Sequence, residues 1–311
     1  MRADRTLLPS GQGTVVTVGT FDGVHLGHRF VLDRLAERAR DAGLLSVLVT
    51  FDPHPLDVVR PGSSPLLLTT PDERAEVLAT TSVDYVVVMR FTAAVARLTA
   101  EEFVDQVLLP RLDMRALLIG HDHGFGRGRE GDAAALTRIG AARGFAVDVV
   151  DVYEGPEGRA VSSSAIRAAV AEGDLAAAAA GLGRRYAIAG RVVSGARRGR
   201  LLGFPTINIV PPPRKLLPAH GVYSVLVETP RGRFGGMLNL GAKPTFDDPL
   251  VTLEAHLFDA DVDLYDAPVR LEFLSRLREV RRFGSPEALV AQLRDDEAQA
   301  RRTVRALTQT L

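Results

Sequence analysis

The chain has 311 residues, a mass of 33.4 kDa and no net formal charge, because 38 basic residues balance 38 acidic ones. This length favours two domains of ordinary size, and the charge balance excludes a global field that would draw the protein onto nucleic acid or an anionic membrane. The absence of cysteine excludes disulfides and thiolate metal sites and fits a reducing compartment.

No targeting segment or membrane span is expected. The first residues lack the long apolar core of a signal peptide, and no run of about eighteen apolar residues occurs. We therefore expect a cytoplasmic protein with small-molecule substrates and with neither a membrane nor a nucleic acid as partner. It is expected to be a monomer or a weak homo-oligomer.

The first half of the chain alternates short apolar runs with amphipathic stretches. This rhythm predicts a parallel β-sheet covered by helices, an α/β fold. The expected strands are residues 15–18, 46–50, 85–89, 116–120 and 145–150, and the expected helices are residues 29–40, 71–79 and 101–108.

Three polar segments begin where expected parallel strands end. They are GTFDGVHLGH at 19–28, FDPHP at 51–55 and GHDHGFGRGREGD at 120–132, and they hold five of the seven histidines. Open α/β sheets bind ligands at the carboxyl ends of their strands. The three loops therefore predict one ligand site.

The first of these loops is suited to phosphate. Its glycines let the backbone approach a ligand, and the helix from Gly27 points its amides and positive dipole end at the same place. His25 and His28 are three residues apart, so on a first helical turn both imidazoles face one side and can donate hydrogen bonds to a phosphate that gains charge in a transition state. The alternatives are a structural turn and a zinc site, although zinc asks for further protein ligands. Adenylyl transfer is the favoured interpretation.

A second phosphate signal is VSSSAIR at 161–167. At a helix start, the hydroxyls of Ser163 and Ser164, the free amides and the Arg167 guanidinium can hold pyrophosphate oxygens. An ordinary N-cap serine followed by an exposed arginine is the alternative. Together with the first loop, the segment favours a nucleotide site.

Two further features of the first half are ambiguous. Residues 126–131 satisfy GxGxxG, with Asp148 or Asp151 about twenty residues on, as in a dinucleotide fingerprint. We reject this reading because the first glycine comes six residues after the strand end at Gly120 instead of in the tight turn. The FDPHP segment is a rigid turn by default, but its position makes Pro53, His54 and Pro55 candidate walls for a flat ring.

Beyond a helix that ends at Gly183 the pattern changes to a period of two, bounded by Gly, Pro and Asp. The boundary gives domains 1–183 and 184–311, the second an antiparallel sheet or small barrel. Its expected strands are 186–193, 222–228, 234–240, 251–258 and 269–273. Ser285 followed by Pro286 opens a final helix that runs nearly to Leu311.

The second half carries its own phosphate signal. Gly195, Gly199 and Gly203 alternate with arginines, and Thr206 and Asn208 follow on an extended segment where they face the same way. Glycine-rich backbone with a hydroxyl and an amide oxygen suits Mg²⁺ and phosphate, and a basic turn or an RNA-contacting patch is the alternative.

Glu254 is the candidate general base of this half. Strand alternation turns it with Thr252 and His256 toward one face, expected to be the barrel interior, where a carboxylate needs a functional reason. A solvated strand face is the alternative.

In this order the motifs resemble those of the bacterial bifunctional riboflavin kinase/FMN adenylyltransferases, also called FAD synthetases, over nearly the whole chain. GTFDGVHLGH, TFDPHP, residues 120–132 and VSSSAIR resemble the adenylyltransferase module; GRLLGFPTIN, GVYSV, NLGAKPTF, LEAHLFD and DLYDAPV resemble the flavokinase module. The resemblance implies an N-terminal Rossmann-like nucleotidyltransferase domain with a parallel sheet and a C-terminal antiparallel β-barrel flavokinase domain that ends in a helix.

The resemblance also implies two reactions. In the barrel, Glu254 deprotonates the 5′-hydroxyl of riboflavin, which attacks the γ-phosphate of ATP and gives FMN, with Mg²⁺ near Thr206 and Asn208. In the first domain, the FMN phosphate attacks the α-phosphorus of a second ATP and FAD is released. The implied adenylyltransferase residues are Gly19, Phe21, Asp22, His25, His28, Ser163, Ser164 and Arg167 for ATP, and Pro53, His54, Pro55 and Asp122 for flavin; Gly199, Gly203, Thr206 and Asn208 bind ATP in the kinase.

Three alternatives stay open from the sequence. One is a single-activity enzyme, either a flavokinase or an adenylyltransferase, with a degenerate second site. Another is a dinucleotide-binding oxidoreductase, and the third is a nucleic-acid-binding module that uses the turn at 197–200.

Overall fold

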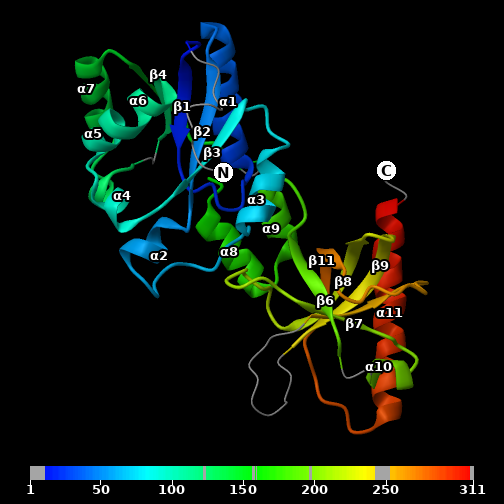
Figure 1. Cartoon of the computed structure of the whole chain (residues 1–311). Helices are drawn as coiled ribbons and strands as arrows, with labels where there is room; N and C mark the ends of the chain where they lie inside the picture. The colour runs from blue at the N-terminus through cyan, green and yellow to red at the C-terminus, as the bar shows by residue number, and fades with distance from the viewer. Residues whose placement is uncertain are drawn as a thin grey trace. The chain divides into compact units, whose positions relative to one another are not determined.

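The structure is a computed structural model that describes residues 11–121, 124–155, 158, 160–195, 198–241 and 253–308. The chain forms two compact units, residues 1–162 and 163–311 (Figure 1). Helices α8 (Ser163–Glu172) and α9 (Leu175–Leu182) therefore group with the second unit. The boundary near Gly183 stays a prediction about folding and activity.

The first unit contains a five-stranded sheet in the order β3-β2-β1-β4-β5, in which all neighbouring strands are parallel. This confirms the α/β prediction. The strand order reverses between β1 and β4, and the carboxyl ends of strands at such a switch point are where open α/β sheets bind ligands. The strands are β1 (Thr14–Val18), β2 (Leu45–Asp52), β3 (Tyr85–Arg90), β4 (Met114–Gly120) and β5 (Ala146–Val150).

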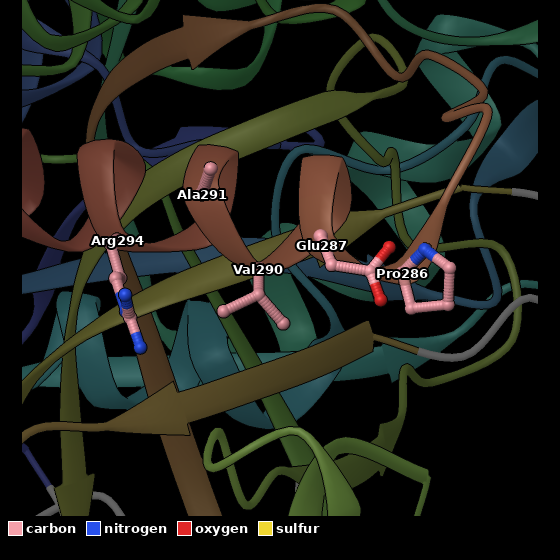
Figure 2. A pocket seen from close by; sticks show the side chains of 5 residues that line it. All are labelled: Pro286, Glu287, Val290, Ala291 and Arg294. Carbon is pink, nitrogen blue, oxygen red and sulfur yellow. The ribbon is translucent and has the colours of Figure 1, made fainter.

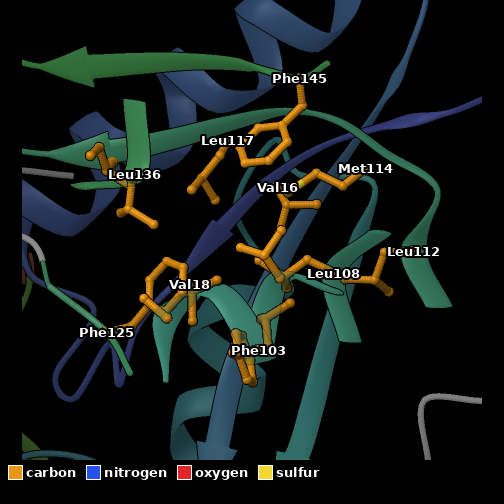
Figure 3. Close-up of a cluster of buried hydrophobic side chains, with 14 of the residues drawn as sticks. Val16, Val18, Phe103, Leu108, Leu112, Met114, Leu117, Phe125, Leu136 and Phe145 are labelled. Carbon is orange, nitrogen blue, oxygen red and sulfur yellow. The ribbon is translucent and has the colours of Figure 1, made fainter. Parts of the chain in front are cut away.

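Helices cover both faces of this sheet because successive strand residues point to opposite sides. Val15 and Leu48 pack with α1 (Leu26–Ala42) and α3 (Pro71–Leu78) on one face. Val16 and Leu117 belong to the cluster on the other face (Figure 3). That face is covered by α5 (Ala100–Phe103), a π-helical turn (Val104–Leu108), α6 (Leu109–Leu112) and α7 (Ala133–Arg143). Two short helices, α2 (Pro55–Val59) and α4 (Ala93–Arg97), complete the unit.

The second unit is built around a closed six-stranded barrel in the order β10-β7-β6-β11-β8-β9 with antiparallel neighbours. This confirms the small-barrel prediction, although β7 was expected only as an extended segment. The strands are β6 (Ala187–Val193), β7 (Ile207–Val210), β8 (Gly221–Thr229), β9 (Gly232–Leu240), β10 (Leu253–Leu257) and β11 (Pro268–Arg278).

The final helix α11 (Pro286–Thr308) packs on the outside of this barrel. Ala300 is fully buried with Met237 and Phe258, and the Ser224 hydroxyl donates to the Ala300 carbonyl at 3.4 Å. The predicted helix start is confirmed, because the Ser285 hydroxyl accepts from the Ala288 amide at 3.2 Å. The short helix α10 (Arg198–Leu201) precedes β7.

Among the described residues, every helix is too short or too polar to span a lipid bilayer.

Candidate functional site

His25 is the N-cap of α1, a place where Ser, Thr, Asp or Asn is usual. Its Nδ1 accepts the backbone N–H of His28 at 3.2 Å, and its side chain is buried. Because Nδ1 is used as an acceptor, Nε2 is the ring nitrogen that carries the proton. The cap therefore orients one N–H donor of the imidazole at the start of α1.

The two histidine rings stack on each other, as the spacing of three residues predicts. Their centroids are 3.6 Å apart with an angle of 18° between the planes, and Phe21 lies against His28 at 4.6 Å. Gly27 leaves room for the His25 ring in this stack, since a Cβ at Gly27 would come within 3.2 Å of that ring and 3.4 Å of the Val161 carbonyl oxygen. The start of VSSSAIR thus approaches the same helix terminus.

The backbone of this loop is strained. Phe21 has φ 50° and Val24 has φ 40°, on either side of Gly23 at φ 82°. Non-glycine residues in this region cost on the order of 1–3 kcal/mol each and persist only where the surroundings hold them. The loop therefore needs strong tertiary contacts.

Asp22 supplies several of those contacts. The carboxylate is 1% exposed and accepts the backbone N–H of Leu68 at 3.0 Å, the backbone N–H of Thr69 at 2.9 Å and the Thr69 hydroxyl at 3.1 Å. Thr69 Oγ1 also accepts the Gly23 N–H at 2.9 Å. These contacts fasten the loop to residues 68–69, and the expected contact of Asp22 with ATP stays a prediction.

The FDPHP segment follows β2, the strand beside β1. His54 caps α2 as His25 caps α1, with Nδ1 accepting the Leu56 N–H at 3.2 Å. Pro53 is exposed and follows a cis peptide bond, whereas His54 and Pro55 are half-buried. The described members of the expected flavin wall thus follow the strand next to the phosphate loop, and Asp122 lies outside the described residues.

The serines of VSSSAIR occur at a helix start, as predicted. Ser163 opens α8 half-buried, Ser164 is exposed, and Arg167 is half-buried one turn on. The helix is held by Ile166 and Val170, which are 2% and 0% exposed. These three predicted residues belong to the second compact unit and Val161 to the first.

The GxGxxG segment is a packed loop. Gly126 and Gly131 both face Ala100. A Cβ on Gly126 would lie 2.5 Å from the Ala100 backbone nitrogen, and a Cβ on Gly131 would lie 2.7 Å from the Ala100 Cβ. Arg127 donates its backbone N–H to Leu98 at 2.8 Å. The glycines therefore serve close packing on α5, which agrees with rejecting a dinucleotide fingerprint.

The zinc alternative gains no support from the part of the chain that the structure describes. Within it, no group of three or more His, Asp or Glu side chains could hold a metal ion.

Glu254 lies on the outer side of the barrel, so its expected position in the interior is wrong. Leu253 and Ala255, its neighbours in β10, are 0% exposed and pair in register with the fully buried Leu240 and Leu238. The interior is thus filled by the opposite face of the strand, and Glu254 is half-buried. It belongs to one row of register partners across the outer surface, the Glu254 row: Val193, Asn208, Glu254, Asn239 and Val222.

Two glycines that precede β7 pack closely against Asn208 and against the residues just before β7. A Cβ on Gly195 would lie 1.9 Å from Asn208 Nδ2, so the loop backbone rests directly on that amide. A Cβ on Gly199 would lie 2.2 Å from the Phe204 carbonyl oxygen and 3.5 Å from Thr206 Oγ1. Asn208 is 5% exposed and is the register partner of Glu254. Asn208 and Glu254 therefore lie side by side on neighbouring strands, and the grouping of both with Thr206 around ATP stays a prediction. The left-handed Gly203, at φ 83°, follows α10 as a turn residue.

His256 is a residue that sequence reasoning placed on the face of Glu254 without giving it a role. Its Nδ1 lies 2.7 Å from the carbonyl oxygen of Pro205, and its ring meets Phe204 edge-on at 5.4 Å. It is 9% exposed. This hydrogen bond fixes the backbone next to Thr206.

A pocket occurs at the start of α11 (Figure 2), and none of the residues predicted for either reaction lines it. Hydrogen bonds from its own backbone and from the Ser285 hydroxyl lower the pKa of Glu287, which keeps a negative charge at the helix N-terminus. The lining residues are Pro286, Glu287, Val290, Ala291 and Arg294.

Comparison with known proteins assigns each half of the chain. The model of the FAD synthetase family matches residues 8–165, and the model of the riboflavin kinase family matches residues 182–304. The bifunctional riboflavin kinase/FMN adenylyltransferase of Escherichia coli K12 is 40% identical over 295 residues, which are 93% of this chain and 92% of that protein. The chain belongs to this bifunctional family.

Other members show the same full-length similarity. The Pseudomonas fluorescens enzyme of the same name is 39% identical over 97% of this chain and 96% of its own length, and the Listeria monocytogenes enzyme is 34% identical over 92% and 91%. The prediction of a two-part enzyme of FAD biosynthesis, with a kinase half and a nucleotidyltransferase half, is confirmed by these matches.

The fold agrees with a solved structure. The crystal structure described as a macrolide-efflux protein from Streptococcus pneumoniae superposes with a TM-score of 0.86 at 31% identity, over 96% of this chain and 97% of that one. The efflux activity is stated of that protein, and neither family model that matches this chain describes it. The shared feature is the two-part architecture.

Proposed function

We propose that the second unit phosphorylates riboflavin to FMN and that the first loop system adenylylates FMN to FAD with release of pyrophosphate. The observation that carries this assignment is that each half has a family match together with a gathered polar site: Asn208 beside Glu254 in one, and stacked His25 and His28 in the other.

In the kinase, Glu254 acts as the general base. Its position on the outer side of the barrel, half-buried between its register partners Asn208 and Asn239, lets a carboxylate meet an incoming hydroxyl at the barrel wall. The 5′-oxygen of riboflavin then attacks the γ-phosphorus of ATP and ADP leaves. The backbone at Gly195 and Gly199 lies close to Asn208 and Thr206. Because glycine has no side chain, the backbone amides at these two positions can approach the phosphates of ATP.

The oxygens at this site fit a magnesium ion. The Thr206 hydroxyl and the Asn208 amide oxygen are hard ligands of the type that Mg²⁺ prefers together with substrate phosphates. When bound, Mg²⁺ neutralises charge on the phosphates. Thr206 and Asn208 are the residues that would hold it.

In the adenylyltransferase, the chemistry is positioning and electrostatic stabilisation. A phosphate oxygen of FMN attacks the α-phosphorus of ATP, and pyrophosphate leaves from the opposite side. His25 donates from Nε2, because Nδ1 caps the helix, and the stacked His28 faces the same side. Gly19 and Phe21 belong to the loop that approaches ATP. The departing pyrophosphate is held by Ser163, Ser164 and Arg167. The flavin is contacted by Pro53, His54, Pro55 and Asp122.

The direct test is incubation of the purified chain with riboflavin, ATP and Mg²⁺, followed by chromatographic separation of the flavins. FMN should form first and FAD second. Accumulation of FMN without FAD would leave the kinase alone, and unchanged riboflavin together with unchanged FMN in a separate incubation would reject both activities.

Two variants test whether the sites are chemically independent. Glu254→Gln should stop FMN formation from riboflavin and leave FMN-to-FAD conversion intact, whereas His28→Ala should do the reverse. Glu228→Gln is the matched control, because Glu228 is an exposed strand carboxylate of the same barrel outside the Glu254 row. Loss of both activities in either variant would contradict independent sites.

A further inference from the structure

Arg74 is a buried charged residue of the first unit to which sequence reasoning gave no role. It lies in α3, packed beneath the loops that follow β1 and β2, and is 6% exposed. Its Nη1 donates to the Thr20 carbonyl at 2.9 Å, and its Nη2 donates to the Phe51 carbonyl at 2.8 Å. One guanidinium thus bridges GTFDGVHLGH and FDPHP.

The two carbonyls belong to the segments expected to carry different substrates. Thr20 lies between Gly19 and the strained Phe21 of the phosphate loop, and Phe51 lies two residues before Pro53, the first of the residues expected to contact flavin. The Thr20 carbonyl also accepts the Thr50 hydroxyl at 3.0 Å. The bridge therefore ties both loops to the same point at the end of β2.

The charge of Arg74 is buried and lies near two carboxylates. Burial lowers the pKa of the Arg74 guanidinium, while the nearby carboxylates of Asp22 and Asp52 oppose that effect. A buried guanidinium is costly unless its donors are used. Here one donor binds a carbonyl of the phosphate loop, and another binds a carbonyl near the end of β2, just before the flavin loop. An apolar side chain of similar volume would fill the space without joining the loops.

We propose that Arg74 is a positioning residue for adenylyl transfer, which sets the separation of the ATP loop and the flavin loop by holding the Thr20 and Phe51 carbonyls. The inference rests on the proposed adenylyltransferase function. Each loop keeps its own contacts, such as those of Asp22 to Leu68 and Thr69, without Arg74. Loss of the bridge therefore affects how the substrates meet more than how each one binds.

The test compares kcat and KM for FAD formation from FMN and ATP in three variants. Arg74→Met keeps the volume and removes both donors, and we expect kcat to fall at least about tenfold with both KM values within about threefold, since a misplacement on the order of 1 Å can cost on the order of 100-fold in rate. Arg74→Lys keeps the charge and can reach one carbonyl, so its kcat should be intermediate.

Arg38→Met is the matched control. Arg38 lies near the far end of α1 and pairs with Asp148 of β5 at 2.8 Å, away from both loops. Its removal takes an arginine contact from the same unit, and kcat should stay within about twofold of the wild type. All assays are run on folded protein below the measured Tm, with flavokinase activity as an internal reference.

The outcomes separate this inference from the function on which it rests. FAD formation by the wild type together with an unchanged kcat in Arg74→Met would overturn the inference alone, as would a rise in KM without a fall in kcat. Full activity of Arg74→Lys would contradict a role for the bridge between the two carbonyls, and equal losses in Arg38→Met would overturn the inference by reducing the effect to general stability. A wild type that makes no FAD would overturn both.

Discussion

At the scale of single residues, His25 combines two roles that mutation can separate. Its Nδ1 caps α1, and its Nε2 is the donor proposed for the transferring phosphate. Asparagine is among the strongest N-cap residues and lacks a second nitrogen at the Nε2 position. An asparagine at this position would therefore keep the helix start and lose the donor.

We predict that His25→Asn leaves Tm nearly unchanged and lowers kcat for FAD formation about 10²–10³-fold, the usual effect of removing one such donor. His25→Ala should lose the same activity and also the cap, which is worth about 1 kcal/mol. Tm by calorimetry and a steady-state assay on each variant separate the effects. Wild-type kcat in the asparagine variant would assign His25 to structure alone.

His256 offers a similar separation in the kinase. Its hydrogen bond to the Pro205 carbonyl fixes the backbone beside Thr206, and it has no place in the reaction itself. His256→Leu should raise the Mg²⁺ concentration needed for half-maximal FMN formation about fivefold, because one lost hydrogen bond of about 1 kcal/mol loosens a proposed ligand. His256→Asn, which can keep a donor near the Nδ1 position, should recover part of the loss.

The measurement is a magnesium titration of riboflavin phosphorylation, with FMN-to-FAD conversion as the internal reference. Equal magnesium dependence in the wild type and the leucine variant would contradict this view of His256.

At the scale of elements, a buried ion pair joins α11 to the barrel in addition to their apolar contact. Arg278 of β11 donates to both oxygens of Asp296 at distances of 2.7–3.0 Å, and the Asp296 side chain is 3% exposed. Gln292 also donates to Asp296 at 2.7 Å. Removing one partner of a buried pair leaves the other charge uncompensated, at a cost of about 3–5 kcal/mol.

Asp296→Ala should therefore lower the stability of the second unit by about that amount, measured by denaturant unfolding with flavokinase activity as the probe. Asp259→Asn is the control, because the Asp259 side chain is 80% exposed and its pair with Arg301 at 2.7 Å is in solvent. Arg301 lowers the pKa of Asp259. The contribution of that pair to stability is present at neutral pH and is lost as the pH falls through the folded pKa of Asp259. The stabilities of Asp259→Asn and the wild type should therefore converge in acid.

Equal destabilisation by Asp296→Ala and Asp259→Asn would contradict the importance of burial.

The elements themselves were largely predictable, because their patterns are local. Alternating and continuous apolar runs predicted the parallel strands and most of the barrel strands. The start of α11 was predicted from Ser285 and Pro286, an N-cap residue followed by proline. The segment that forms β7 was expected to be extended but not to be a barrel strand, because it has only four residues and follows a glycine-rich turn. The helix expected at 101–108 is divided into α5 and a π-helical turn, a distinction of hydrogen-bond register that residue spacing does not encode.

The site was less predictable where it depends on distant partners. The sequence identified His25 and Asn208, but nothing near Asp22 shows that its carboxylate turns to residues 68–69. Arg74 looks like an ordinary surface arginine of a helix until the loops above it are known. The face of Glu254 was wrong because strand alternation gives two faces, and only the neighbours Leu240 and Leu238 reveal which one is the interior.

At the scale of the whole molecule, the predicted boundary at Gly183 and the compact division at 162/163 assign α8 and α9 differently. Neither family model covers residues 166–181, because one ends at 165 and the other begins at 182. Packing joins α9 to β11, and a Cβ on Gly173 would come within 3.1 Å of Arg276 Cδ and 3.4 Å of the Tyr223 hydroxyl. The proposed adenylyl transfer, in contrast, uses Ser163, Ser164 and Arg167 to hold pyrophosphate.

Fragments of the chain decide between these assignments. Residues 1–183 should convert FMN to FAD, whereas residues 1–162 should not, because the shorter fragment lacks the serine hydroxyls and the guanidinium proposed to hold pyrophosphate. Residues 163–311 and 184–311 should both phosphorylate riboflavin, with a higher Tm for the longer fragment, since only that fragment keeps the contact of α9 with β11. Equal FAD formation by the two N-terminal fragments would remove α8 from the adenylyltransferase, and equal Tm values of the C-terminal fragments would support a boundary at Gly183 for folding as well as for activity.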